Sequence, residues 1–371
     1  MVASSAIREQ MKGEINNNPE LSARQAYDNV VQNIDRRLRD NVPSFESARS
    51  ALDRERRKHI PEIPLDIANV QIDGRWRRTT DGRRFLSKID NAWGYAVFAT
   101  DEALECLGEC NDVFMDGTFK SVPRPYAQLL TVHGFYRDRV IPLVFVLMHD
   151  RQIGTYRQVF SHIKRKFNRL TGNQLQPTNI ITDFETGLIT AAETEFPQAR
   201  MYGCFFHFCR SLWRKCQTEG LTRAYERGNR LKKFIRKIMA IAYLPVAVVR
   251  QNYRVLLQER GTLALLRRYG EGLTNFVNYF TRNYMNGQFQ PAFWNVYLRD
   301  MDTRTNNHVE CKLKYIFSSP ELKAQVSFSD HLSSVVCLSV CPSVCKLFTF
   351  SSFSPEPLGQ FQPNLTQSIL G

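Results

Sequence analysis

The chain has 371 residues, 43% of them hydrophobic and 23% charged, which is enough for two domains or for one large domain with an insertion. No apolar run approaches the length of a membrane span, and residues 1–20 contain no apolar signal core, so a membrane or secreted protein is disfavoured. Nine cysteines in a chain this long are no disulfide scaffold and fit reduced thiols in the cytosol or nucleus.

The net charge of +14 is concentrated in one segment. Residues 1–199 have 27 basic and 26 acidic side chains, residues 200–317 have 21 and 7, and residues 318–371 have 2 and 3. Because basic side chains neutralise phosphates and release counterions, the middle segment predicts that the partner is a polyanion such as DNA. The candidate DNA contacts are Arg210, Arg214, Lys215, Arg230, Lys232, Lys233, Arg236 and Lys237.

The N-terminal part of the chain, residues 1–72, is expected to be a helical region. Apolar residues from Ala23 to Leu38 recur close to the helical period, and Pro61 and Pro64 later interrupt the helical pattern. Two interpretations stay open, a small helical domain that helps to grip DNA and a solvated arm.

Residues 73–207 have short apolar and aromatic runs typical of strands, with two helical patterns among them. The expected strands are residues 93–100, 111–119, 126–136, 140–148, 179–183 and 200–206, and the expected helices are residues 156–170 and 188–196. Counted from residue 111, the order is β-β-β-α-β-α-β, an antiparallel meander followed by parallel strands. This is the order of an α/β fold with a ribonuclease H-like core.

Residues 208–300 show helical periodicity without a strand pattern, which predicts an all-helical insertion. Its aromatic residues, such as Trp213 and Tyr225, are expected in the helical core rather than stacked on bases. Residues 301–317 are expected to form a final core helix. Residues 318–371 form a Ser-rich, low-complexity tail that we expect to be disordered, and its three regularly spaced cysteines are only a weak zinc signal.

Three carboxylates form the candidate catalytic group. Asp116 is expected to end the first core strand and Asp183 the fourth, so both would open at one sheet edge and offer hard oxygen ligands to Mg²⁺ or Mn²⁺. Glu310 falls early in a helix that Thr305 or Asn306 could cap. Two divalent ions about 4 Å apart can activate an attacking oxygen and stabilise a leaving oxygen. From spacing alone, ordinary turn residues are the favoured interpretation.

An ordered set of motifs favours the catalytic interpretation of these carboxylates over ordinary turn residues. The motifs are Asp116-Gly-Thr-Phe-Lys120, Pro125-Tyr-Ala-Gln128, Ile181-Thr-Asp183-Phe-Glu185, Cys204-Phe-Phe-His207 and Arg304-Thr-Asn-Asn-His-Val-Glu310. The set, over roughly residues 75–311, resembles the transposases of Mutator-like elements (MULEs). The resemblance implies a DDE-type core with Asp116, Asp183 and Glu310 as catalytic metal ligands, a helical insertion before the glutamate, DNA as partner and work in the nucleus.

The chain departs from the family pattern at both ends. No Cys/His zinc module precedes residue 100, and Glu310 is followed by Cys-Lys-Leu-Lys where the family commonly has Gly-Trp-His. We therefore expect impaired catalysis, and the stretch from about Tyr315 looks like translated non-coding or repetitive DNA. The alternative function is a domesticated, non-catalytic DNA-binding transcriptional regulator. Whether the chain forms a homo-oligomer stays open.

Two further candidates have two interpretations each. Cys204 and His207 could bind zinc or position a DNA strand near the metals, or they could be a buried small residue and a capped strand end. Glu185 could be a base beside Asp183 or a carboxylate favoured by a helix N-terminus.

Other chemistries are disfavoured. His133 and His149 are expected at strand ends in structural roles. No Gly-x-Ser-x-Gly elbow indicates a serine hydrolase, and no Gly-rich phosphate loop indicates an ATPase.

Overall fold

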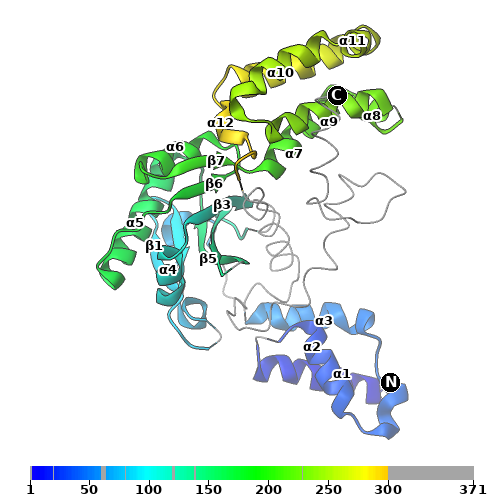
Figure 1. The fold of residues 1–371 in the computed structure, drawn as a ribbon. Coiled ribbons are helices and arrows are strands. Elements are labelled where there is room, and N and C mark those ends of the chain that lie inside the picture. Colours follow the sequence, from blue (N-terminus) through cyan, green and yellow to red (C-terminus); the bar gives the residue numbers. More distant parts are fainter. Residues whose placement is uncertain are drawn as a thin grey trace.

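The computed structural model describes residues 2–19, 21–59, 64–79, 81–118, 122–137, 139–227 and 229–299. Within them the chain is a mixed α/β structure in which helices flank a seven-stranded sheet (Figure 1). In this part no helix combines the length and the apolar character that a membrane span requires. The expected final helix with Glu310 and the expected tail, residues 318–371, lie outside the described residues.

Three N-terminal helices pack on one another: α1 (Val2–Asn17), α2 (Ala23–Asn33) and α3 (Phe45–Lys58). Their shared core consists of Ile7, Met11, Ile15, Ala23, Ala26, Val30, Ala48 and Leu52. The helical pattern expected to reach Leu38 stops at the end of α2. There the Asp35 carboxylate accepts a hydrogen bond from the Arg37 amide (2.9 Å) and begins a separate 3₁₀ turn, which leaves Leu38 38% exposed.

The sheet has the strand order β1-β2-β5-β4-β3-β6-β7. The strands are β1 (Leu86–Asp90), β2 (Tyr95–Phe98), β3 (Asp112–Thr118), β4 (Gln128–Tyr136), β5 (Arg139–Met148), β6 (Asn179–Thr182) and β7 (Arg200–Gly203). In this spatial order, the neighbours among β1, β2, β5, β4 and β3 are all antiparallel, whereas β6 is parallel to both β3 and β7. The predicted order of elements from residue 111 onward is confirmed. His133 lies within β4, fully buried, and not at a strand end.

Helices α4 (Asp101–Gly108), α5 (Ile153–Thr171) and α6 (Thr186–Glu195) pack on one face of the sheet (Figure 1). The apolar stripe predicted along α5 faces this core, with Tyr156, Val159, Phe160, Ile163 and Phe167 buried. Helix α4 was not predicted, although Thr100 marks its start by accepting a hydrogen bond from the Ala103 amide (3.1 Å). The opposite face carries a second apolar cluster around Phe114, Ile181 and Phe206.

After β7 the described chain is helical and lies at the β7 side of the sheet (Figure 1). The helices are α7 (Phe205–Thr218), α8 (Thr222–Arg227), α9 (Asn229–Ala240), α10 (Val246–Gln258), α11 (Arg260–Phe280) and α12 (Pro291–Trp294). Helix α11 is broken at Gly270, whose φ of +54° suits glycine. The aromatic residues expected in the core are confirmed there: Trp213, Tyr225, Tyr253, Tyr284 and Trp294 are buried.

The last predicted strand, residues 200–206, is wrong at its end. β7 stops at Gly203, which pairs with Thr182, the final residue of β6. With no partner strand beyond that point, the chain turns at Cys204 and α7 begins at Phe205. His207 therefore lies in the first turn of a helix.

Candidate active site

Asp116 and Asp183 lie side by side at one end of two parallel strands. Met115 of β3 pairs with Thr182 of β6, so the next residue along each strand is an aspartate. Asp116 is 3% exposed. It was expected to end its strand, but β3 continues to Thr118 because β4 pairs with it that far. The predicted meeting of the two strands is confirmed, and the third predicted carboxylate, Glu310, lies outside the described residues.

The environment of Asp183 disfavours its charged form. Burial raises the pKa of its carboxyl to about 7, and the nearby charges of Asp116 and Glu185 add to this, whereas His207 opposes it. Desolvation next to a second carboxylate is typical of sites that bind a cation or hold a proton. The two aspartates therefore form a candidate site with a physical signature as well as a sequence motif.

His207 faces the same pair of carboxylates. Its Nε2 lies 3.7 Å from Asp116 Oδ1, and its side chain is 15% exposed. The early position of His207 in α7 determines this approach, because α7 begins directly after β7, the neighbour of β6. Sequence reasoning selected His207 for its motif but placed it at a strand end.

A series of hydrogen bonds that runs from β4 through α5 holds the Glu185 side chain. The Gln128 amide donates to the Tyr156 hydroxyl (2.7 Å), which donates to Glu185 Oε1 (2.8 Å). The Glu185 amide in turn donates to Asp183 Oδ1 (3.3 Å). Burial raises the pKa of the Glu185 carboxyl, and the hydrogen bond from Tyr156 opposes this. Glu185 occupies the cap position of α6 without a side-chain capping bond, and its backbone amide contacts the Asp183 carboxylate.

Phe184, between the two acidic residues, fastens this loop to the helical region. Its ring packs edge-on against Tyr284, Phe289 and Phe293, with centroid distances of 5.6, 4.9 and 5.5 Å. Gly203 of β7 makes room for it, since a Cβ there would lie 2.7 Å from the Phe184 ring. The helices thus pack directly on the segment that carries Asp183. Nothing in the sequence pattern indicated this contact.

A comparison with protein families supports the same segment. The family model of the MULE transposase domain matches residues 113–211, from β3 into α7. Over residues 113–211 the chain is therefore similar to a MULE transposase domain. The domain contains both aspartates and His207, and a transposase domain implies an interaction with DNA. No curated protein matches the chain.

Within the MULE transposase domain, Cys204 and His207 do not share a visible set of metal ligands. Cys204 is fully buried in the apolar cluster with Phe114 and Ile181. Burial raises the pKa of the nearby Cys209 thiol, which disfavours the thiolate that zinc binds. Over the residues that the structure describes, no group of three or more His, Cys, Asp or Glu side chains is placed to hold a metal ion.

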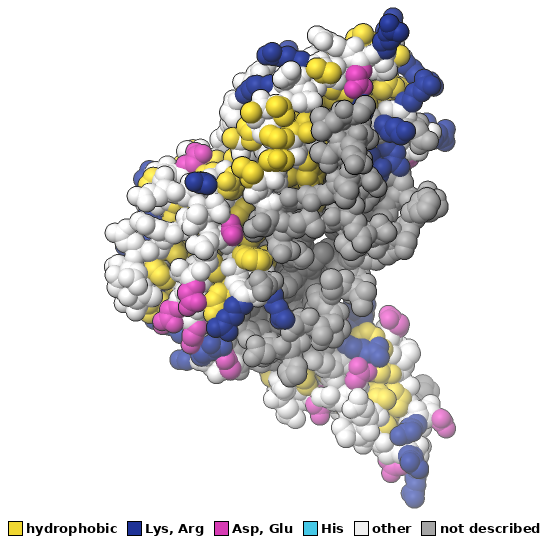
Figure 2. Space-filling view, in the orientation of Figure 1, with side chains coloured by type: hydrophobic (Ala, Val, Ile, Leu, Met, Phe, Trp, Pro, Cys, Tyr) yellow, Lys and Arg dark blue, Asp and Glu magenta, His cyan; other side chains and the backbone are white. Residues whose placement is uncertain are grey.

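The eight cations predicted to bind DNA lie on α7 and α9, at the end of the domain and beyond it. Four are exposed: Arg214, Arg230, Lys233 and Arg236. The other four are Arg210 and Lys232, which are partly buried, and Lys215 and Lys237, which form ion pairs with Glu219 (2.5 Å) and Glu259 (3.0 Å). Figure 2 shows Lys and Arg side chains over the helical region with few acidic side chains among them.

The first prediction concerns the buried carboxyl of Asp183. In metal-free buffer, Asp183→Asn is expected to stabilise the chain, increasingly as pH rises. The folded carboxyl titrates near 7 and the unfolded one near its ordinary value of 3.8. Between these values the folded state retains a proton that the unfolded state has lost. The wild-type stability therefore falls by about 1.4 kcal/mol per pH unit across this window and levels off above it.

Urea unfolding in EDTA from about pH 4 to about pH 8 measures this difference. Asp73→Asn, at a side chain that is 74% exposed, controls for the loss of a surface carboxylate. A stability difference between wild type and Asp183→Asn that does not change with pH would contradict the prediction.

The second prediction concerns the hydrogen-bonded chain. Tyr156→Phe removes the donor to the Glu185 carboxylate and is expected to lower the free energy of unfolding by about 1–3 kcal/mol. Tyr126→Phe is the matched control, because the buried Tyr126 hydroxyl has no hydrogen-bond partner among the described residues. The control is expected to change stability by less than about 0.5 kcal/mol. Urea unfolding measures the free energy of unfolding of both variants. Equal losses of stability would show that the hydrogen bond to Glu185 contributes nothing specific.

Proposed function

We propose that the chain is a DNA transposase of the MULE type that cleaves and joins DNA strands in a metal-dependent reaction. The observation that carries the proposal is the position of Asp116 and Asp183, each one residue beyond the Met115–Thr182 pair of the parallel strands β3 and β6, within the matched domain. Strands β5-β4-β3-β6-β7, three antiparallel and then two parallel, support a ribonuclease H-like core. DDE chemistry is part of this proposal, with Glu310 as the third carboxylate.

The donor set fits a divalent cation. Two carboxylates offer the hard oxygen ligands that Mg²⁺ and Mn²⁺ prefer, and a bound cation would favour the charged form of Asp183 that burial, and then the nearby carboxylates, disfavour. Asp116, Asp183 and Glu310 would hold two such ions, which supply an activated attacking oxygen and a stabilised leaving oxygen for DNA strand cleavage. Zinc at Cys204 and His207 remains a separate and weaker proposal.

The surrounding side chains position the two aspartates. The chain from Gln128 through Tyr156 to Glu185 orients the Asp183 loop from the α5 side. His207 approaches Asp116 from α7, where it could hold that carboxylate or, when protonated, a DNA phosphate. Small displacements of a reacting group are costly, so these contacts matter for rate as well as for stability.

The partner that the charge distribution favours is DNA, at element ends and at targets. Between Arg200 and Arg299 the chain has 18 basic and four acidic side chains. Phosphate neutralisation by such a surface gives affinity without sequence preference. We place this work in the nucleus, and a homo-oligomer that pairs two element ends is part of the proposal.

The third prediction tests the helical DNA surface. Lys233→Gln with Arg236→Gln removes two exposed cations of α9, and we expect DNA affinity to fall and the slope of log K against log salt to decrease by about two. Lys237→Gln, on the same helix, is the control because Glu259 already pairs with this cation. Fluorescence anisotropy with a labelled duplex at several salt concentrations measures both. If the double variant binds as wild type does, the DNA surface lies elsewhere.

The fourth prediction tests catalysis. With Mg²⁺ or Mn²⁺, the chain is expected to nick supercoiled plasmid DNA slowly, and Asp116→Asn or Asp183→Asn to reduce the rate by at least about 100-fold. Glu109→Gln, an exposed carboxylate just before β3, is the control. A version restored to the family pattern after Glu310 is expected to nick faster.

Two outcomes would contradict the fourth prediction. If both aspartate variants still nick DNA at the wild-type rate, the proposed site does not take part in the reaction. DNA binding with no nicking in either the given or the restored chain would favour the alternative function, a non-catalytic DNA-binding transcriptional regulator.

A further inference from the structure

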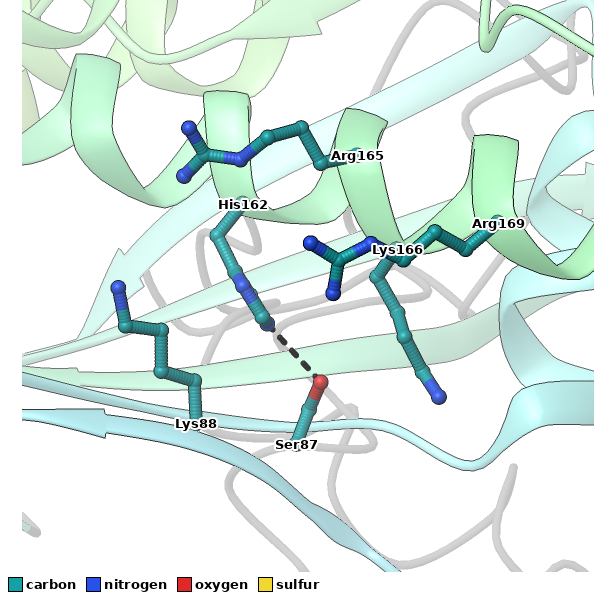
Figure 3. A pocket seen from close by; sticks show the side chains of 6 residues that line it. All are labelled: Ser87, Lys88, His162, Arg165, Lys166 and Arg169. Carbon is teal, nitrogen blue, oxygen red and sulfur yellow. Dashed lines mark hydrogen bonds between the residues drawn. The ribbon is translucent and has the colours of Figure 1, made fainter.

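A basic pocket lies between helix α5 and the edge strand β1 (Figure 3). Its volume is about 360 Å³, and its lining residues are Ser87, Lys88, His162, Arg165, Lys166 and Arg169. The last four lie on one face of α5, because residues three, four and seven apart are neighbours on a helix. His162 and Lys166 point toward the two β1 residues, and the Arg165 and Arg169 side chains run along the helix at the pocket (Figure 3). The β1 residues lie where the pairing of β1 with β2 shifts in register.

The pocket holds more positive charge than its acidic neighbours offset. Lys88 pairs with Asp90 (2.9 Å), and Lys166 pairs with Asp101 (2.9 Å). Arg165 and Arg169 are both exposed, and neither forms an ion pair with any described residue. Two guanidinium groups are therefore available to an anion, and their planar forks suit phosphate oxygens.

His162 adds neutral hydrogen-bonding capacity to the pocket. Its Nε2 lies 2.9 Å from Ser87 Oγ. Burial, and then the charges of Lys88, Arg165, Lys166 and Arg169, lower the pKa of His162 to about 4. The imidazole is neutral near pH 7, so it adds no positive charge to the four cations around it.

We propose that this pocket binds a backbone phosphate of the DNA that the chain acts on, away from the Asp116–Asp183 pair. The inference rests on the proposed function for its ligand. Two guanidinium groups without an ion pair in the described part of the chain, beside two paired lysines, match a tetrahedral oxyanion better than a single carboxylate, because phosphate accepts several N–H donors at once.

The length of α5 relates the pocket to the active site. Tyr156, near its start, contacts Glu185 beside Asp183, and Arg169 lies thirteen residues further along the same helix. At about 1.5 Å per residue this is about 20 Å, which corresponds to roughly six nucleotides of a DNA strand. The pocket would thus hold DNA that flanks the reacting phosphate, at the side of the sheet opposite to β7 and its helices.

The test compares two double variants of the full chain that remove the same charge from the same helix. Arg165→Gln with Arg169→Gln removes the two guanidinium groups of the pocket that form no ion pair with a described residue. Arg157→Gln with Lys164→Gln removes two cations that pair with Glu195 (3.2 and 3.4 Å) and is the matched control. Affinity for a labelled duplex is measured in EDTA at several salt concentrations, and inorganic phosphate alone is titrated as a second probe.

We expect the pocket variant to lose about tenfold in DNA affinity and about two in salt slope, and the control to change little. Equal effects in the two variants would overturn the proposal, because they would reflect net charge alone. If the pocket variant loses inorganic phosphate binding but retains DNA affinity, a free phosphate is the ligand and the DNA assignment is wrong. The assay involves no cleavage, so a failed nicking test would leave its result intact.

Discussion

Parallel pairing of β3 with β6 is the constraint on which the candidate site depends. It places Asp116 and Asp183 at the same end of neighbouring strands, where Asp116 is buried and desolvation acts on the Asp183 carboxyl. Burial and mutual repulsion raise the pKa of Asp183, so the arrangement is unfavourable in the absence of a compensating charge. Such an arrangement is typical of a site that binds a cation.

The segment that carries Asp183 is held from two directions. On one side the chain of hydrogen bonds through Tyr156 fixes Glu185, and on the other the ring of Phe184 packs against aromatic residues of the helical region. The helical region therefore packs directly on the segment that carries Asp183, through residues that follow α11.

The sequence predicted six of the seven strands, all but β1, and the meeting of the strands that carry the two aspartates, because short apolar runs and the order of connections determine which strands meet. It could not predict contacts between side chains on different elements, such as Tyr156 with Glu185, because no periodicity relates them. The end of β7 at Gly203 depends on the length of its partner strand, which a local pattern does not encode. The pocket at Arg165 and Arg169 was hidden because acidic residues elsewhere balance the charge of residues 1–199.

The central claim is that Asp116 and Asp183 together bind a divalent cation. The most direct measurement is an electron paramagnetic resonance titration of the full chain with Mn²⁺ near neutral pH, with wild type, Asp116→Asn and Asp183→Asn compared at equal concentration. The account predicts that wild type binds Mn²⁺ and that each single substitution abolishes or greatly weakens binding. Unchanged Mn²⁺ binding in both variants, or no binding by wild type, would contradict it.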